Sequence, residues 1–205
     1  MEEFNCSIKR GLTDRASRQL IINNDHIKFQ DKKLNKEVFS TFLKSEITDY
    51  RFGIYWLRLD ITFGRQYRVF IRNKDKQTLK ITFKSYLKYK LNEVHQQYCD
   101  ILDALWKFHF SPITDDHLKR FETEEELILG NVRFTKEGLY IDEKYGLIYW
   151  EDVRTSNYYS YFAIYSDKDP SNINRQYNYM NDWNTTVLYS TLRTILKYKN
   201  IENYD

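Results

Sequence analysis

The chain contains the same local pattern twice, and this internal repeat is the strongest constraint on its fold. Residues 22–29 (Ile-Asn-Asn-Asp-His-Ile-Lys-Phe) and 134–141 (Phe-Thr-Lys-Glu-Gly-Leu-Tyr-Ile) both consist of an apolar residue, a polar turn and an alternating strand. Residues 42–47 and 148–153 form a second matching pair, each with an acidic residue before a final aliphatic one. The offset is 112 residues for the first pair and 106 for the second, so the copies differ by a six-residue loop change. This repeat predicts two small domains in tandem.

Length and composition agree with two soluble domains. Each half of the 205 residues is long enough to bury a core of its own. The 41% hydrophobic content argues against disorder, and no apolar run approaches the roughly 20 residues that cross a bilayer. The N-terminus lacks the pattern of a signal peptide, and the two cysteines, Cys6 and Cys99, show no pairing pattern. We therefore expect a cytoplasmic protein.

The net charge is divided between the halves. Residues 1–110 contain 21 Lys and Arg against 13 Asp and Glu, a balance of +8, whereas residues 111–205 contain 11 against 16, a balance of −5. One interpretation is that the first half binds an anionic partner, such as lipid headgroups, nucleic acid or an acidic protein surface. The other is that the opposite charges help the two halves dock on each other.

Strand patterns in each half are followed by one helical pattern. In the first half, residues 57–63, 67–72 and 79–83 alternate as an antiparallel meander after a lead-in at residues 1–18. Apolar residues fall at even positions up to Trp56 and at odd positions from Leu57, which predicts a bulge or bend there. A helix is expected over about 86–108, with Ser85 as its N-cap and a linker at 109–116, because Pro112 stops a helix.

The second half repeats this plan with strands near 127–129, 132–134, 139–141, 147–150, 158–165 and 177–179, and a helix over about 184–198 capped by Asn184. The predicted class is therefore α+β, with domains at 1–112 and 113–205. Each domain is expected to be an antiparallel meander followed by one C-terminal helix.

This order of elements resembles that of pleckstrin-homology (PH) domains. The segment Ile148-Tyr-Trp-Glu-Asp-Val153 is similar to the I-x-W-x-D-I stretch of bacterial PH-like proteins, including the YcxB-like group, whereas Lys44 stands at the Trp position in the first copy. The resemblance implies two tandem PH-like units, each a partly open barrel. It also implies a scaffold that binds lipids, peptides or proteins and has no catalytic apparatus. Many bacterial relatives carry transmembrane helices, which this sequence lacks.

The sequence offers little for catalysis or for metal binding. The four histidines have no H-x-x-x-H spacing, and no Gly-rich phosphate loop or G-x-S-x-G turn occurs. Glu151 and Asp152 are neighbours on a strand and would point to opposite faces, so they do not form a catalytic pair. We expect no enzyme, no cofactor and no metal.

A basic surface is the first of two candidate binding surfaces. Strand alternation places five cationic side chains together on the outer face of the first meander: Arg58, Arg68, Arg72, Lys80 and Lys84. Lys32, Lys33 and Lys36 follow the first strand, where the resemblance implies headgroup-binding residues, although the usual K-x-R-x-R run is absent. The alternative is that these cations protect the sheet against edge-to-edge aggregation.

An aromatic surface is the second. Tyr159, Tyr161 and Tyr165 are expected to line the outer face of one strand, with Trp150 as a further candidate, and tyrosine is enriched at protein interfaces. The alternative is that this face packs on the first domain or forms a homodimer. The hypothesis is a non-catalytic adaptor or immunity-type inhibitor that binds a protein partner through the tyrosine strand and the groove between the domains. The alternatives are anionic membrane or, less in keeping with the acidic second half, nucleic acid.

Overall fold

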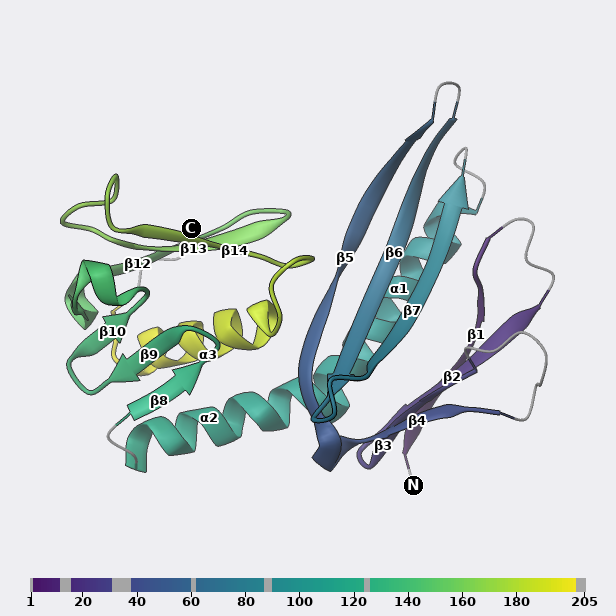
Figure 1. Cartoon of the computed structure of the whole chain (residues 1–205), viewed down its shortest axis with the longest axis horizontal. Helices are drawn as coiled ribbons and strands as arrows, with labels where there is room; N and C mark the ends of the chain where they lie inside the picture. Colours follow the sequence, from purple (N-terminus) through teal and green to yellow (C-terminus); the bar gives the residue numbers. More distant parts are fainter. Residues whose placement is uncertain are drawn as a thin grey trace. The chain divides into compact units, whose positions relative to one another are not determined.

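The computed structural model describes residues 2–11, 16–30, 38–59, 62–86, 90–123 and 126–201. It confirms the α+β class, with antiparallel sheets and helices (Figure 1). The chain divides into two compact units, Met1–Ser111 and Pro112–Asp205.

The first unit begins with a four-stranded antiparallel sheet. Its strands are β1 (Glu3–Lys9), β2 (Ser17–Asn23), β3 (His26–Phe29) and β4 (Ser40–Leu43), and each pairs with the next. Alternate apolar residues of β2 and β3 are fully buried, including Leu20, Ile22, Ile27 and Phe29. The sheet therefore contributes one apolar face to the core, as strand alternation requires.

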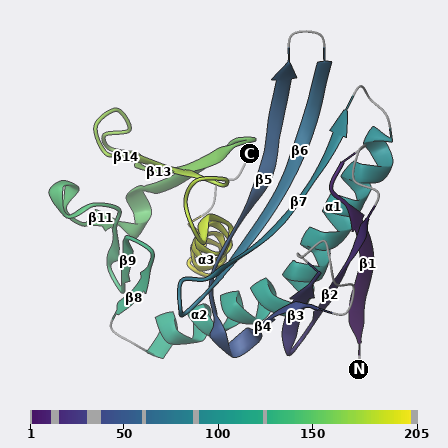
Figure 2. The ribbon, with the colours of Figure 1, turned by 45° about the vertical axis from the view of Figure 1, so that its right-hand side comes forward.

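A second antiparallel sheet contains the three longest strands. These are β5 (Ile47–Leu59), β6 (Thr62–Asn73) and β7 (Thr78–Tyr86). The core residues expected on β6 and β7 are confirmed, because Tyr67, Val69, Ile71, Leu79, Ile81 and Phe83 are all buried. Within the described residues, the pairing of β6 with β7 reaches Gly64, which lies opposite Tyr86, while the pairing with β5 continues to Thr62. The β5–β6 hairpin therefore extends past the end of β7 (Figures 1 and 2).

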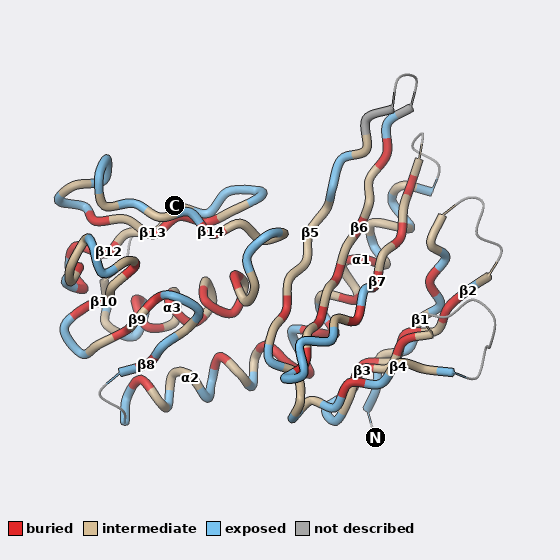
Figure 3. Tube along the Cα trace, viewed as in Figure 1, coloured by how far each residue is buried: buried red, intermediate tan, exposed pale blue. Residues whose placement is uncertain are grey.

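The expected bend after Trp56 is wrong. β5 keeps one register with β6 from Asp49 to Leu59, and the irregularity lies instead between Ile47 and Asp49. Leu57 is consequently opposite Gly64, whereas Trp56 is opposite Arg65. The prediction failed because apolar residues occur at both strand parities near the end of this hairpin, where large side chains are exposed instead of buried (Figure 3).

The linker predicted around Pro112 is also wrong. α1 (Leu91–Leu105), the π-helical segment η2 (Trp106–Phe110) and α2 (Ser111–Thr123) follow one another without a non-helical residue. Ser85 is not an N-cap, because it lies in β7 and α1 begins at Leu91. The π-helical segment ends just before Pro112, and the Ser111 N–H donates to the carbonyl of Trp106, five residues earlier. Within this segment the carbonyl of Phe108 accepts a hydrogen bond from Lys44 Nζ at 2.6 Å.

The second unit has the same order of elements. After α2, a four-stranded sheet contains β8 (Glu126–Leu129), β9 (Val132–Thr135), β10 (Gly138–Tyr140) and β11 (Ile148–Tyr149). A three-stranded sheet contains β12 (Val153–Asn157), β13 (Tyr161–Ser166) and β14 (Asn174–Asn178). The C-terminal helix α3 (Thr185–Tyr198) confirms the predicted one, with Asn184 at its N-cap position.

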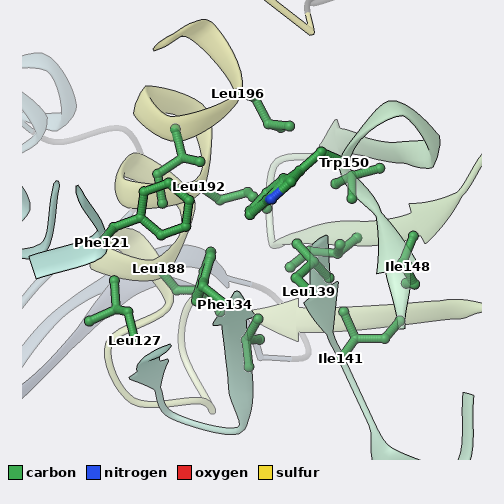
Figure 4. Close-up of a cluster of buried hydrophobic side chains, with 14 of the residues drawn as sticks. Phe121, Leu127, Phe134, Leu139, Ile141, Ile148, Trp150, Leu188, Leu192 and Leu196 are labelled. Carbon is green, nitrogen blue, oxygen red and sulfur yellow. The ribbon is translucent and has the colours of Figure 1, made fainter. Parts of the chain in front are cut away.

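The core of the second unit lies between its sheets and its helices. Trp150 and Phe121 approach edge to face with ring centres 5.6 Å apart, and Leu188, Leu192 and Leu196 of α3 surround them (Figure 4). Each of these five side chains is buried. Burial of large apolar side chains supplies most of the driving force for folding such a unit.

The repeat seen in the sequence extends to the structure. The turns η1 (Lys44–Glu46) and η4 (Trp150–Asp152) occupy corresponding positions, and β5 and β12 begin directly after them. In each unit the described strands form a four-stranded sheet, then a three-stranded sheet, and a helix follows.

Candidate binding surface

Large aromatic side chains are exposed at the end of the β5–β6 hairpin. Tyr55, Trp56 and Phe63 have exposed fractions of 49%, 51% and 74%. Arg65 and Arg68 of β6 lie beside them, and we call these five residues the hairpin cluster. Phe63 was expected in the core, and its exposure corrects that prediction. The described part of β7 ends level with Gly64, so it does not cover this end of the hairpin.

Arginine side chains lie over the aromatic rings of the opposite strand. The guanidinium carbon of Arg65 is 4.5 Å from the centre of the Trp56 ring, and that of Arg68 is 4.7 Å from the Tyr55 ring. Arg68 lies opposite Gly53, which has no side chain, so it has room to lean toward Tyr55. A guanidinium group stacked on a ring gains cation–π attraction and keeps its N–H donors in a fixed plane. The cluster is therefore partly ordered before any partner binds.

Only part of the cluster belongs to a basic face: Tyr55 and Arg68 lie on it, whereas the strand register puts Trp56, Arg65 and Phe63 on the opposite face of the hairpin. Residues paired across an antiparallel sheet share a face, so the strand registers define the outer face of β5–β6–β7, opposite the buried Tyr67 and Val69. The charged and large residues of this outer face whose side chains are described are Asp49, Arg51, Tyr55, Leu57, Gln66, Arg68, Phe70, Arg72, Lys80, Lys84 and Tyr86. Five are cations and one is an acid. Arg51 lies over Phe70 at 5.2 Å, which repeats the arginine–aromatic pairing of the cluster.

The single acid of this outer face is already paired. Arg72 Nε donates to Asp49 Oδ2 at 2.7 Å. Burial of Asp49 acts to raise its pKa, but hydrogen bonds from Arg72 and Thr48 outweigh burial and hold the pKa below its usual value. The carboxylate therefore stays ionised, and Arg72 is largely neutralised by it.

The predicted basic residues are only partly brought together. Arg68, Arg72, Lys80 and Lys84 lie on the outer face of β5–β6–β7. Arg58 lies opposite Phe63 in β5, but its side chain is outside the described part of the structure. Lys32, Lys33 and Lys36 also fall outside the described residues. Sequence reasoning missed the aromatic members of the cluster, although apolar residues at both strand parities were their signal.

The predicted tyrosine ladder is not a single surface. Tyr161 and Tyr165 are four residues apart on one face of β13, and both are half-buried. Tyr159 lies in the preceding loop and is 71% exposed. Tyr161 stacks on Tyr158, with ring centres 4.6 Å apart.

Trp150 is not a surface residue, which corrects the prediction. It is 4% exposed, and its indole N–H donates to the carbonyls of Thr135 and Lys136. The turn η4 interrupts the strand at this residue, so strand alternation did not report the direction of its ring.

Titratable groups buried in the first unit are held in their neutral forms. Burial lowers the pKa of His109 to about 4 and raises the pKa of Tyr50 well above its usual value. The Tyr50 hydroxyl oxygen and His109 Nδ1 share a hydrogen bond, with 3.0 Å between them. Cys99 lies 3.8 Å from His95 Nε2, but burial and the nearby Asp103 and Asp100 raise the pKa of its thiol, so it is not an activated nucleophile.

Within the described residues, no group of three or more His, Cys, Asp or Glu side chains is arranged to hold a metal ion. No helix in the described ranges combines the length and apolar character needed to span a membrane. Comparison of the chain with protein-family models, with curated proteins and with solved structures found no match.

Proposed function

We propose that this chain is a non-catalytic binding protein made of two tandem PH-like units, and that it binds a protein partner through the hairpin cluster. The order of elements supports the PH-like part: each unit has four strands, a short turn, three strands and a helix. The repeated position of η1 and η4 supports a common origin for the two units. On this proposal the protein acts by contact, as an adaptor or as an inhibitor of its partner.

The observation that carries the proposal is the composition and exposure of the hairpin cluster. Trp, Tyr and Arg are the residue types that contribute most to binding energy at protein interfaces, and aromatic residues are enriched at interface centres. Here one Trp, one Tyr, one Phe and two Arg gather on a single hairpin, with Phe63 74% exposed. Burying these rings against a partner would remove apolar area from water with few side-chain rotations to restrict.

A pull-down with matched variants tests the proposal. The immobilised chain, a Trp56→Ala/Phe63→Ala double variant and a Tyr149→Ala/Tyr198→Ala control are each exposed to lysate of the source organism. The control removes two aromatic rings of the second unit that are similarly exposed. We expect proteins bound by the wild-type chain and by the control to be lost from the cluster variant, with unchanged circular dichroism.

The proposal is wrong if the cluster variant retains the same proteins as the control. It is also wrong if the cluster is needed only for co-sedimentation with anionic vesicles, since exposed aromatic residues beside cations also suit a membrane interface. Vesicle co-sedimentation of the same three proteins supplies that second measurement.

A further inference from the structure

We infer that the partner contributes an acidic protein surface, whose carboxylates bind across the outer face of β5–β6–β7. This inference rests on the proposed function, because it names the chemistry of the partner that the hairpin cluster binds. Tyr55 and Arg68 of the cluster lie on this outer face, so a partner bound there reaches the end of the hairpin, while Trp56 and Phe63 lie on the hairpin's opposite face.

Charge on the outer face is the first argument. Its cations are Arg51, Arg68, Arg72, Lys80 and Lys84, and its one acid, Asp49, is bound by Arg72. Among the described residues, neither Lys80 nor Lys84 forms an ion pair, and Lys80 is exposed. Like charges gathered on one face repel one another, and an acidic partner relieves that repulsion while also steering association.

The geometry of the cations favours carboxylates over a polyphosphate backbone. Asp49 and Arg72 show within the chain that a carboxylate fits on this outer face, with an N–O distance of 2.7 Å. A partner carboxylate would do for Lys80 and Lys84 what Asp49 does for Arg72. Neutral Gln66, Thr78 and Thr82 lie between the cations, and the Asp49–Arg72 ion pair adds no net positive charge, so the face lacks the continuous positive charge that a line of phosphates favours. The outer face is thus a set of separate cationic positions, which suits separate acidic side chains.

The cationic positions are spaced for an extended segment. Lys80 and Lys84 are four residues apart on one strand, which is about 13 Å. Carboxylates four residues apart on an extended acidic segment have the same spacing. Lys80 also lies next to Phe70, and Lys84 lies next to Gln66, whose other neighbour is Tyr55, so each lysine has a neighbour that can contact the rest of such a segment.

Fluorescence anisotropy with labelled poly-L-glutamate tests the inference on the full chain. The face variant is Arg68→Glu/Lys80→Glu, and the matched control is Lys9→Glu/Lys136→Glu, which makes the same charge change at exposed positions elsewhere. We expect the Kd of the face variant to rise at least about tenfold and that of the control to rise less than about twofold. Raising the salt concentration should weaken wild-type binding, because exposed charges are screened.

Equal weakening in both variants would overturn the inference, since binding would then follow net charge alone. Tighter binding of poly(U) RNA or of phosphatidylglycerol vesicles through the same residues would overturn it too, because the recognised anion would be a phosphate. The two proposals fail separately. If the face variant still captures the lysate proteins that the Trp56→Ala/Phe63→Ala variant loses, the acidic partner is wrong and the proposed function stands. If poly-L-glutamate binding maps to the outer face but the cluster variant captures the same proteins, the proposed function is wrong.

Discussion

Lys44 and Trp150 occupy corresponding positions of the repeat but have different structural roles. Trp150 fills the core of the second unit, where Lys199 lies over its ring at 5.2 Å. Lys44, at the same offset in the first unit, donates to the carbonyl of Phe108 in the π-helical segment before Pro112. The sequence shows that Lys stands where Trp is expected, but not what it contacts, because Phe108 is 64 residues away along the chain. Lys44 therefore connects the turn η1 to the helix, whereas Trp150 fills a core.

The buried His109 makes stability depend on pH. Its pKa is about 4 in the folded chain against 6.5 as the ordinary value, so the unfolded chain takes up the proton first as pH falls. Its contribution to stability is thus complete above about pH 6.5 and is lost as pH falls toward 4, by at most about 1.4 kcal/mol per pH unit. His109→Gln keeps an acceptor for Tyr50 and does not titrate. Urea unfolding between about pH 7 and about pH 5 should show a smaller loss of stability for this variant. If the free energy of unfolding depended on pH with the same slope in both proteins, His109 would not be the group responsible.

At the level of elements, the sequence predicts a strand or helix correctly when all of its apolar side chains lie in a core. The buried residues of β6, β7 and α3 repeat at strand or helix spacing, and β7 and α3 were predicted within a few residues, whereas β6 begins at Thr62, five residues before the predicted strand at 67–72. β5 was misread because Tyr55, Trp56 and Leu57 are large and apolar without being core residues. Residues 109–116 were misread because the chain passes Pro112 through a π-helical segment and α2 without leaving the helix. Four of the five described cations of the outer face followed from strand alternation, and Arg51 was not predicted. The aromatic members of the hairpin cluster did not follow, because exposure at a strand end has no periodic signal.

The packing of β10 against β11 requires a glycine. A Cβ atom at Gly138 would lie 2.0 Å from the carbonyl oxygen of Ile148, which is backbone and cannot rotate away. Gly138→Ala should therefore lower the free energy of unfolding by about 3 kcal/mol or more. Gly11→Ala is the matched control, since nothing lies within 4 Å of its added Cβ, and it should change stability by less than about 0.5 kcal/mol. Chemical denaturation measures the free energy of unfolding of both variants. Similar losses for Gly138→Ala and Gly11→Ala would show that the strands shift to accept the methyl group.

For the whole molecule, the repeat predicted the organisation better than any single motif did. The same order of sheets and helix recurs in both units, and the described residues of each contain buried apolar clusters of their own. What each unit binds could not be read in the same way, because binding depends on exposed residues in which the copies differ. The first unit has an outer face with five cations, while the corresponding face of β13 has half-buried tyrosines.

Separate cores predict separate unfolding. Trp150→Ala removes a buried ring of the second unit and should destabilise that unit by about 3–5 kcal/mol. Hydrogen–deuterium exchange should then show faster exchange across residues 126–201 and unchanged protection in β6 and β7. Equal loss of protection in both units would show that they unfold as one cooperative body.

The unequal lengths of the two corresponding hairpins have an evolutionary consequence. β5 and β6 have 13 and 12 residues, whereas β12 and β13 have 5 and 6. Lengthening a two-stranded ribbon at its free end adds new side chains that no existing interior residue must accommodate. After duplication, one copy could therefore acquire or exchange a recognition surface by insertions at this end while selection preserved both interiors. Homologues of this chain, aligned by their buried residues, should differ most in the length and aromatic content of this ribbon.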